Sequence, residues 1–453
     1  MLRTIFILMI MLATTAPALL KPHVGVLVWS WISYMNPHRL AWGGFINQVP
    51  MLDVVAGVTI LSMLVAREKW RLSWSPLLIS LILLTFWFAL TSLLNQGLYE
   101  FWPRFDRFYK VMLFTFITAA LINKRVRLDA FIYVMLLSLG FFAAKGGFFT
   151  LLTGGGHIVA GPPKSMIGDR NHLGVALIMC IPLCFYAYGH GRHKLIRLGG
   201  LAGLMLFTTA ALGTQSRGAL VTLGAVTAFL VVRSKQRLPL MAFVSIAALL
   251  AFAFLPESWT ERMLTITEYE EDGSATSRIL SWAYAWRIAL DYPLTGSGFG
   301  AFSDAYFAIP YVTEGAQLRA SHSIYYEVLA EHGFIGLFLF FLLFSTAILT
   351  GQKVIKACKG YEQLKWAKDL AVALQAGIIG FAIGGAFLAM SLFDLFYHFI
   401  VMMIATYGIA LRQLKVIQAE QNGLEPDQIP NDVFNRYPAL QKRAKLRPSE
   451  PGQ

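Results

Sequence analysis

The chain alternates between long apolar runs and short polar breaks over most of its length. The runs lie at residues 4–20, 24–36, 49–66, 76–95, 105–122, 128–152, 171–189, 195–213, 217–232, 239–255, 323–350, 367–390 and 395–411. Apolar residues are continuous within each run and do not alternate with polar ones, so the runs predict helices and not the strands of a membrane barrel. Most runs approach the roughly 20 residues that cross a bilayer. The pattern predicts an all-α, polytopic integral membrane protein.

Basic residues between the runs indicate the orientation of the chain. One set of alternate loops, together with the C-terminal tail, holds 24 Lys and Arg residues, and the other set holds 10. Because cytoplasmic loops carry the excess of Lys and Arg, the first set is predicted to be cytoplasmic. We expect about 12 crossings, with residues 4–20 and 24–36 sharing one of them. The loop at 256–322 then faces the periplasm and the C-terminus lies in the cytoplasm.

These runs predict one transmembrane helical domain over residues 1–412, which includes the 256–322 periplasmic loop with its amphipathic helices. Residues 413–453 are polar and rich in proline, so we expect a loose cytoplasmic tail. The first residues combine Arg3, an apolar stretch and Ala16-Pro17-Ala18, a pattern that signal peptides share. An uncleaved first transmembrane segment is the favoured interpretation, and N-terminal sequencing of the mature protein distinguishes the two.

Composition supports the membrane assignment and narrows the chemistry. Hydrophobic residues make up 57% of the 453 residues and charged residues 14%, whereas soluble domains are about half apolar and about a quarter charged. The net charge of +13 is distributed over short loops as orientation signals are, so no nucleic-acid partner is expected. The three cysteines form neither a disulfide framework nor a zinc pattern and are expected to be small buried hydrophobes. No metal and no cofactor are expected.

Two cations lie where a run begins on the predicted outer side. Arg217 starts the run 217–232, and Ser216 before it is a residue type that caps helices by accepting a hydrogen bond from a free backbone amide. Arg170 stands at the start of the run 171–189 in the same way. Helix amino ends attract anions through their free amides and their dipole. Both helix starts are therefore predicted to direct an arginine and backbone amides at an anion.

Two further cations are predicted on the same side of the membrane. Lys164 lies in a glycine- and proline-bearing loop, and Arg278 lies within the 256–322 loop. Guanidinium groups match phosphate oxygens two at a time, so three arginines near one membrane surface suit a diphosphate. Each cation alone could equally contact lipid headgroups, anchor a helix or pair with acidic residues of the loop. For Arg217, the serine cap and the following glycine favour the binding role.

The 256–322 loop contains an amphipathic segment at 277–290. On a helix, Ile279, Ala283, Trp286 and Leu290 share one face. Such a face predicts a helix that lies along the membrane interface with its aromatic side toward lipid.

A glycine-rich segment, GSGFGAF, follows at residues 296–302. As a nucleotide-binding loop it is a weak match, because no strand precedes it and the loop is predicted on the wrong side of the membrane for ATP. We expect tight turning beneath a substrate instead, with Gly298 and Gly300 in the pocket that holds the donor or the acceptor.

The stretch SHSIYYEVLAEHGFIG carries many polar groups for an apolar run. On a helix, His322, Tyr326, Gly333 and Gly336 share one side. The histidine then lies at the outer mouth, and the glycines lie deeper, where they let another helix or a lipid chain come close. Buried ionisable groups in membranes face protein or water, which is our expectation for Glu327 and Glu331 on the neighbouring face.

His322 is the candidate general base. A histidine at the water boundary titrates near neutrality and can accept a proton from a hydroxyl, although an exposed histidine at a helix start is an equally open interpretation. Ser323 and Tyr326 beside it, and Ser216 before Arg217, are assigned to the donor or acceptor pocket. His332 and His398 are expected to be structural hydrogen-bonding groups. No nucleophile pattern accompanies His322, so the residues favour a histidine base and an arginine-bound leaving group without a covalent intermediate.

The order His322-Ser323, Gly333 and Gly336 is similar to the signature of bacterial O-antigen ligases, a superfamily shared with O-antigen polymerases and O-oligosaccharyltransferases. The resemblance extends upstream through SRGAL at 216–220, the long loop with Arg278 and GSGFGAF, and spans roughly residues 165–340. The opening of the chain, with MLRTIFILMIMLATTAPALL and WSWISYMNPHRLAWG, resembles the O-glycosylation ligases found beside exosortase systems.

The resemblance implies about twelve helices with a helical periplasmic loop, in the bacterial inner membrane. It implies transfer of a finished glycan from undecaprenyl diphosphate to a sugar hydroxyl of lipid A-core at the periplasmic face, without metal or nucleotide. It assigns the base role to His322 and diphosphate binding to Arg217 and Arg278; Arg170 and Lys164 are added from their positions. A polymerase, a protein O-glycosylating enzyme with a glycoprotein acceptor, and a polysaccharide transporter or flippase remain open alternatives.

Overall fold

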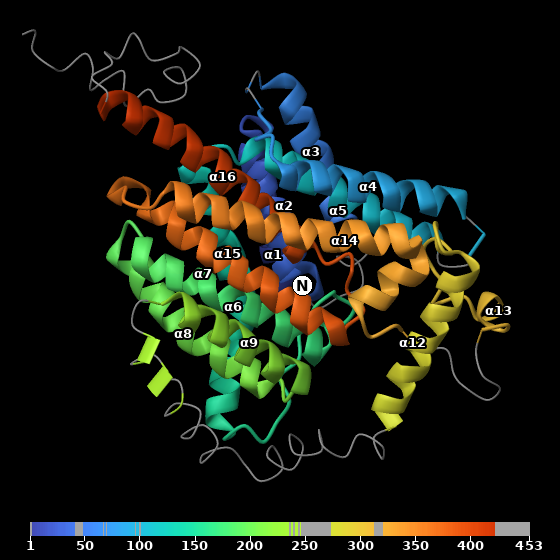
Figure 1. Cartoon of the computed structure of the whole chain (residues 1–453). Helices are drawn as coiled ribbons and strands as arrows, with labels where there is room; N and C mark the ends of the chain where they lie inside the picture. Colours follow the sequence, from blue (N-terminus) through green and yellow to red (C-terminus); the bar gives the residue numbers. More distant parts are fainter. Residues whose placement is uncertain are drawn as a thin grey trace, which may run out of the picture.

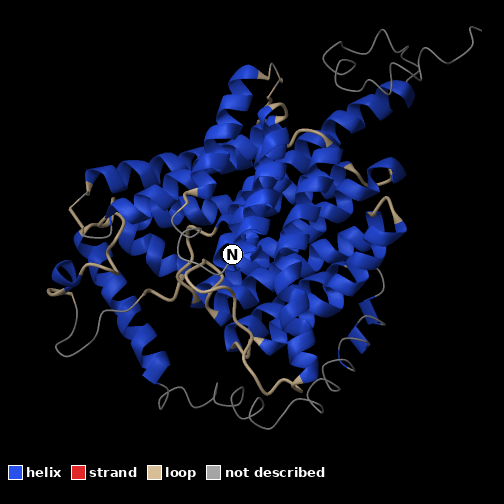
Figure 2. Cartoon of the chain, turned by 180° about the vertical axis from the view of Figure 1, so that it is seen from behind, coloured by secondary structure: helices blue, strands red, loops and turns tan. Residues whose placement is uncertain are grey.

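Helices joined by short loops make up the protein in the computed structural model, which describes residues 2–40, 49–66, 68, 70–95, 97–98, 101–234, 237–238, 241–242, 245, 273–311 and 320–421. Figure 2 shows helices and loops, and no strand, among these residues. In chain order the elements are α1 (Leu2–Thr15), η1 (Ala16–Leu19), α2 (Pro22–Met35), η2 (Pro37–Leu40), α3 (Met51–Val65), α4 (Pro76–Leu94), α5 (Phe101–Leu121), α6 (Arg125–Leu152), α7 (Arg170–His190), α8 (Lys194–Gly213), α9 (Arg217–Arg233), α12 (Gly273–Asp291), α13 (Ala305–Ala308), α14 (Ile324–Ala357), η3 (Glu362–Leu364), α15 (Lys365–Gly384), η4 (Gly385–Phe387) and α16 (Asp394–Gln421).

Within the described residues the apolar runs became helices, which confirms an all-helical, multi-pass membrane protein over that part of the chain. Seven described segments are long and apolar enough to cross a membrane: α4, α6, α7, α8, α14, the segment from η3 through η4, and α16. Shorter apolar helices lie at Ile5–Leu19 and Met51–Val65. The run at 239–255 lies almost entirely outside the described residues, and the figure of about 12 crossings stays a prediction.

The interior of the bundle is formed by α7, α15 and α16, the most buried of the seven candidate spans. Figure 1 shows α4, α14, α15 and α16 running roughly side by side, with α12 standing apart at one end of the bundle. The three cysteines are free and buried, as predicted. Helix α16 continues to Gln421, past the predicted domain boundary at 412, and the remainder of the predicted tail lies outside the described residues.

Helix α12 has the two faces that the sequence predicts. Ile279, Trp286 and Leu290 are 54%, 47% and 59% exposed. On the opposite face, Tyr284 and Ile288 are buried in a small apolar cluster of their own that includes Ala330 of α14. The helix thus packs on α14 and on residues 301–308 with one face and presents apolar side chains on the other. Its placement at a membrane interface stays a prediction.

Helix α14, predicted as one continuous helix, is broken at Gly333, whose φ of 68° and ψ of −172° are not helical. The loop that follows α12 fills the break: Phe334 N donates to Pro293 O at 2.8 Å, Ser297 N to Ala330 O at 2.9 Å, and Gly298 N to Glu331 O at 2.9 Å. These bonds satisfy backbone groups that the break would leave unpaired. The neighbour that comes close at Gly333 is therefore this loop, and not the helix or lipid chain that we expected.

Candidate functional site

A cavity of about 660 Å³ opens where several helices begin. Its walls come from the start of α7, the start of α9, the first half of α12, the residue His322 before α14, and the end of α15 with the residues after it. The volume is within the range of pockets that hold small-molecule ligands. The elements that meet here are far apart in sequence, so the cavity is a product of the whole bundle.

Three arginines from three elements line this cavity: Arg170 at the start of α7, Arg217 at the start of α9, and Arg278 on α12. His322 lines it as well. With Ser216, which also lines the cavity, these are five of the predicted site residues, chosen from separate segments of the sequence. Guanidinium groups from several elements around one cavity have the charge and the hydrogen-bond geometry that suit a multiply charged anion such as a diphosphate.

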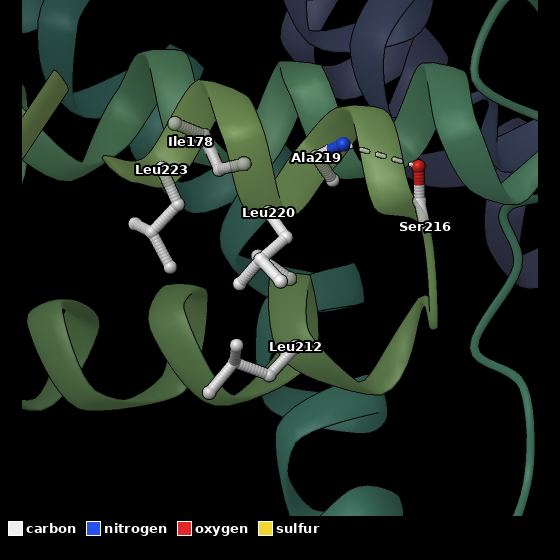
Figure 3. Close-up of a pocket in the computed structure, with 7 residues that line it drawn as sticks. Ile178, Leu212, Ser216, Ala219, Leu220 and Leu223 are labelled. Atoms are coloured by element: carbon white, nitrogen blue, oxygen red, sulfur yellow. Dashed lines mark hydrogen bonds between the residues drawn. The ribbon is translucent and has the colours of Figure 1, made fainter. Parts of the chain in front are cut away.

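The two helix starts at the cavity are capped. The side chain of Ser216 accepts a hydrogen bond from Ala219 N at 3.1 Å, as predicted (Figure 3). Asp169 caps α7 by accepting from Asn171 N at 2.8 Å. The capping fixes the first turn of each helix beside the cavity, where its positive end adds to the arginine charge.

A small apolar pocket lies directly beside Ser216, between α7, α8 and α9 (Figure 3). Ile178, Leu212, Leu220 and Leu223 are among the residues that line it, and its volume is only about 10 Å³. A space of this size holds about one water molecule at most. It is a minor packing gap that seats the start of α9, and it is not a ligand site.

Two residues of the cavity wall have a backbone conformation that side-chain-bearing residues rarely adopt. Gln215 has φ of 49° and His322 has φ of 46°. Gln215 is buried and its amide donates to Gly155 O at 2.9 Å. Such left-handed residues persist only where the surrounding structure holds them, and they cluster at functional sites. Of the four non-glycine residues with positive φ in the described part of the chain, two thus lie in the cavity wall.

The loop that carries His322 is held from the side by α12. Trp282 Nε1 donates to Ser321 O at 2.9 Å, and the Trp282 ring stacks on Tyr326 with centroids 5.2 Å apart. Ser321 Oγ donates to Ser323 O at 3.1 Å. Tyr326 and Ser323 thus support the histidine loop, but neither lines the cavity, so their assignment to a donor or acceptor pocket finds no geometric support.

The structure places three other predicted residues away from the cavity lining. Lys164 is exposed on its loop with φ of 60°. Gly298 and Gly300 are buried in the turn against α14, with φ of 76° and 106°. The expectation of tight turning at GSGFGAF is met, because these φ values favour glycine. The turn lies beneath the kink at Gly333 and not beneath the cavity.

Sequence reasoning missed His172, which lines the cavity from the first turn of α7. Its Nδ1 lies 3.3 Å from Asp169 Oδ1 and its Nε2 lies 3.4 Å from Ala389 O. The hydrogen bond with His172 holds the pKa of Asp169 well below its usual range. The sequence GDRNH at residues 168–172 contained the signal, because a residue three positions after a helix cap lies on the same side of the helix as the cap.

Sequence reasoning also missed Arg104 of α5, which pairs with both glutamates of the α14 stretch. Its guanidinium contacts Glu327, and its Nη1 lies 2.7 Å from Glu331 Oε1. Both glutamates therefore face protein, as expected. His332 is a structural hydrogen-bonding group, with Nδ1 2.7 Å from Thr91 Oγ1, and the ring of His398 bonds to Tyr34.

Two family models match the chain. Residues 201–341 match the family described as O-antigen ligase, Wzy_C. Residues 2–192 match DUF5935, a family of unknown function. No curated protein matches the chain. The first match contains Arg217, Arg278 and His322, and the second contains Arg170, so the cavity is built from both matched regions.

Proposed function

From a chain that carries the O-antigen ligase domain over residues 201–341, we propose a membrane glycosyltransferase that moves a glycan en bloc from undecaprenyl diphosphate to a sugar hydroxyl of lipid A-core. The domain implies ligase or polymerase activity on lipid-linked glycans. The observation that carries the finer proposal is the single cavity shared by Arg170, Arg217, Arg278 and His322. The reaction takes place at the periplasmic face of the inner membrane, with the C-terminus in the cytoplasm.

Anion binding is the first part of the mechanism. The arginines hold the two phosphates of the donor, and the starts of α7 and α9 add their backbone dipoles. Negative charge grows on the diphosphate oxygen as its bond to the anomeric carbon breaks. Fixed positive charge at that position lowers the barrier, because it is aimed at the place where charge develops.

Proton removal is the second part. The imidazole of His322 takes the proton of the acceptor hydroxyl while the hydroxyl oxygen forms its bond to the anomeric carbon. The bond from that carbon to the diphosphate breaks, and undecaprenyl diphosphate leaves with the bonding electrons. The attack comes from the side opposite the leaving group, so an alpha-linked donor gives a beta linkage. No metal ion, cofactor or covalent intermediate takes part.

The test uses purified protein, a lipid-linked glycan donor and three acceptors in parallel: lipid A-core, a second lipid-linked glycan and a peptide. We expect transfer to lipid A-core, with inversion at the anomeric carbon, and no transfer by His322→Ala. Transfer to the second glycan alone would identify a polymerase in place of a ligase. Transfer to the peptide alone would identify a protein O-glycosylation enzyme. Retention of the anomeric configuration would exclude direct displacement, and movement of donor across vesicles without any product would indicate a transporter or flippase.

A further inference from the structure

Arg104 and the two glutamates of α14 form a buried charged group, which we name the Arg104 cluster: Arg104, Glu327 and Glu331. The guanidinium contacts Glu327 with one nitrogen and Glu331, at 2.7 Å, with another. The glutamate side chains are only 4% and 1% exposed. Burying two carboxylates is costly unless each is paired and hydrogen-bonded, so the group is a specific arrangement and not a solvated charge run.

Glu327 also fixes a wall of the cavity. Its Oε2 accepts a hydrogen bond from Ser391 N at 3.0 Å. The short segment that contains Ser391 runs from the end of η4 to α16, and its residue Leu388 lines the cavity. Ala389 of the same segment lies 3.4 Å from the His172 ring. Glu327 therefore joins the helix that follows His322 to the segment that carries Leu388.

Glu331 fixes the loop that leaves α12, the helix that carries Arg278. Its Oε1 accepts a hydrogen bond from Gly300 N at 3.2 Å, and its backbone oxygen accepts one from Gly298 N at 2.9 Å. The Arg104 cluster thus connects the elements that carry His322, Arg278 and the wall segment, although none of its three residues lines the cavity.

We infer that the Arg104 cluster is a positioning unit that holds the His322 imidazole in register with the arginine side of the cavity. The inference rests on the proposed function. A displacement of about 1 Å from a change remote from the chemistry can cost about 100-fold in rate. Arg170 and Arg217 stand on α7 and α9, outside the two helices that carry the cluster, so disturbing the cluster lowers kcat of glycan transfer and leaves the donor KM nearly unchanged.

The experiment compares Arg104→Lys, Glu327→Gln and Glu327→Leu with wild type at several donor concentrations, with rates given per folded molecule. Lysine keeps the charge but cannot hold two carboxylates as a guanidinium does. We therefore expect kcat of Arg104→Lys to fall by about tenfold or more, while the donor KM stays within about threefold of wild type. Glutamine keeps an oxygen for the Ser391 amide and leucine does not, so Glu327→Gln should retain more activity than Glu327→Leu. Arg104→Lys and Glu327→Gln carry the test if the leucine variant does not fold.

Arg127→Lys is the matched control, because Arg127 pairs with Glu68, a partly buried carboxylate, and neither residue lines the cavity. It should lower thermal stability and leave kcat per folded molecule unchanged. Cluster variants that behave like this control, or that lose activity only through KM, overturn the inference and leave the proposed function standing. A wild-type protein that transfers glycan to none of the three acceptors overturns the proposed function, and the inference with it.

Discussion

Replacing Gly333 by alanine should destabilise the protein strongly, because the break in α14 admits no side chain. A Cβ at this position would lie 2.4 Å from Leu294 O, 2.6 Å from Leu294 C and 2.7 Å from Pro293 O. All three are backbone atoms, so no side-chain rotation relieves the clash. The φ of 68° with ψ of −172° adds strain for any residue other than glycine.

The cost of Gly333→Ala follows from these two terms. Holding a non-glycine residue in such a conformation costs about 1–3 kcal/mol, and forcing an extra carbon into packed structure costs about 1–3 kcal/mol. The free energy of unfolding should therefore fall by about 2–6 kcal/mol. Gly224→Ala in α9 is the control: no atom lies within 4 Å of its Cβ, and alanine in a helix is favoured over glycine by about 0.5–1 kcal/mol.

Thermal unfolding of the three purified proteins in the same detergent measures the effect. We expect a clearly lower midpoint for Gly333→Ala and an unchanged or higher midpoint for Gly224→Ala. Equal midpoints for Gly333→Ala and wild type would refute the description of the break and of the loop packed into it.

Three further changes test other parts of the site. Ser216→Ala removes the cap of α9 and should cost about 1 kcal/mol, seen as a thermal midpoint between those of wild type and Gly333→Ala; no shift would contradict the capping role. Trp282→Phe removes the hydrogen bond to Ser321 O but keeps the ring stack on Tyr326, so transfer should slow less than with Trp282→Ala. Wild-type rates in both variants would show that the bond and the stack do not support His322. Donor binding should weaken as salt is raised, because arginine charge is screened, and the dependence should be shallower for Arg217→Gln; a salt-independent affinity would argue against a diphosphate site at the arginines.

Local patterns in the sequence were sufficient for the elements that position the site. The run at 171–189 became α7, and Ser216 caps α9 because a serine before an apolar run specifies its own helix start. The arginines at helix starts line one cavity because helix starts on one side of a bundle lie near one another. His172 was accessible to the same reasoning, since it lies in the first turn of α7, whose start at Arg170 was predicted.

Contacts between segments far apart in the chain could not be predicted from the sequence. Nothing near Arg104 indicates that it pairs with Glu327, 223 residues further along the chain. The break at Gly333 depends on a loop from residues 293–298 that enters α14 from outside, and an apolar run gives no sign of this. Gly298 and Gly300 were placed at the substrate for the same reason: the glycines predict a tight turn but not the element against which the turn packs.

The central claim is that arginine charge binds the diphosphate of the donor while His322 acts only in transfer. It is tested most directly by measuring undecaprenyl diphosphate affinity and glycan transfer on the same preparations of wild type, Arg217→Gln, Arg278→Gln and His322→Ala. The account predicts that each arginine variant loses about tenfold or more in affinity, whereas His322→Ala binds like wild type and transfers nothing. Transfer by His322→Ala at a near wild-type rate, or wild-type affinity in both arginine variants, would contradict it.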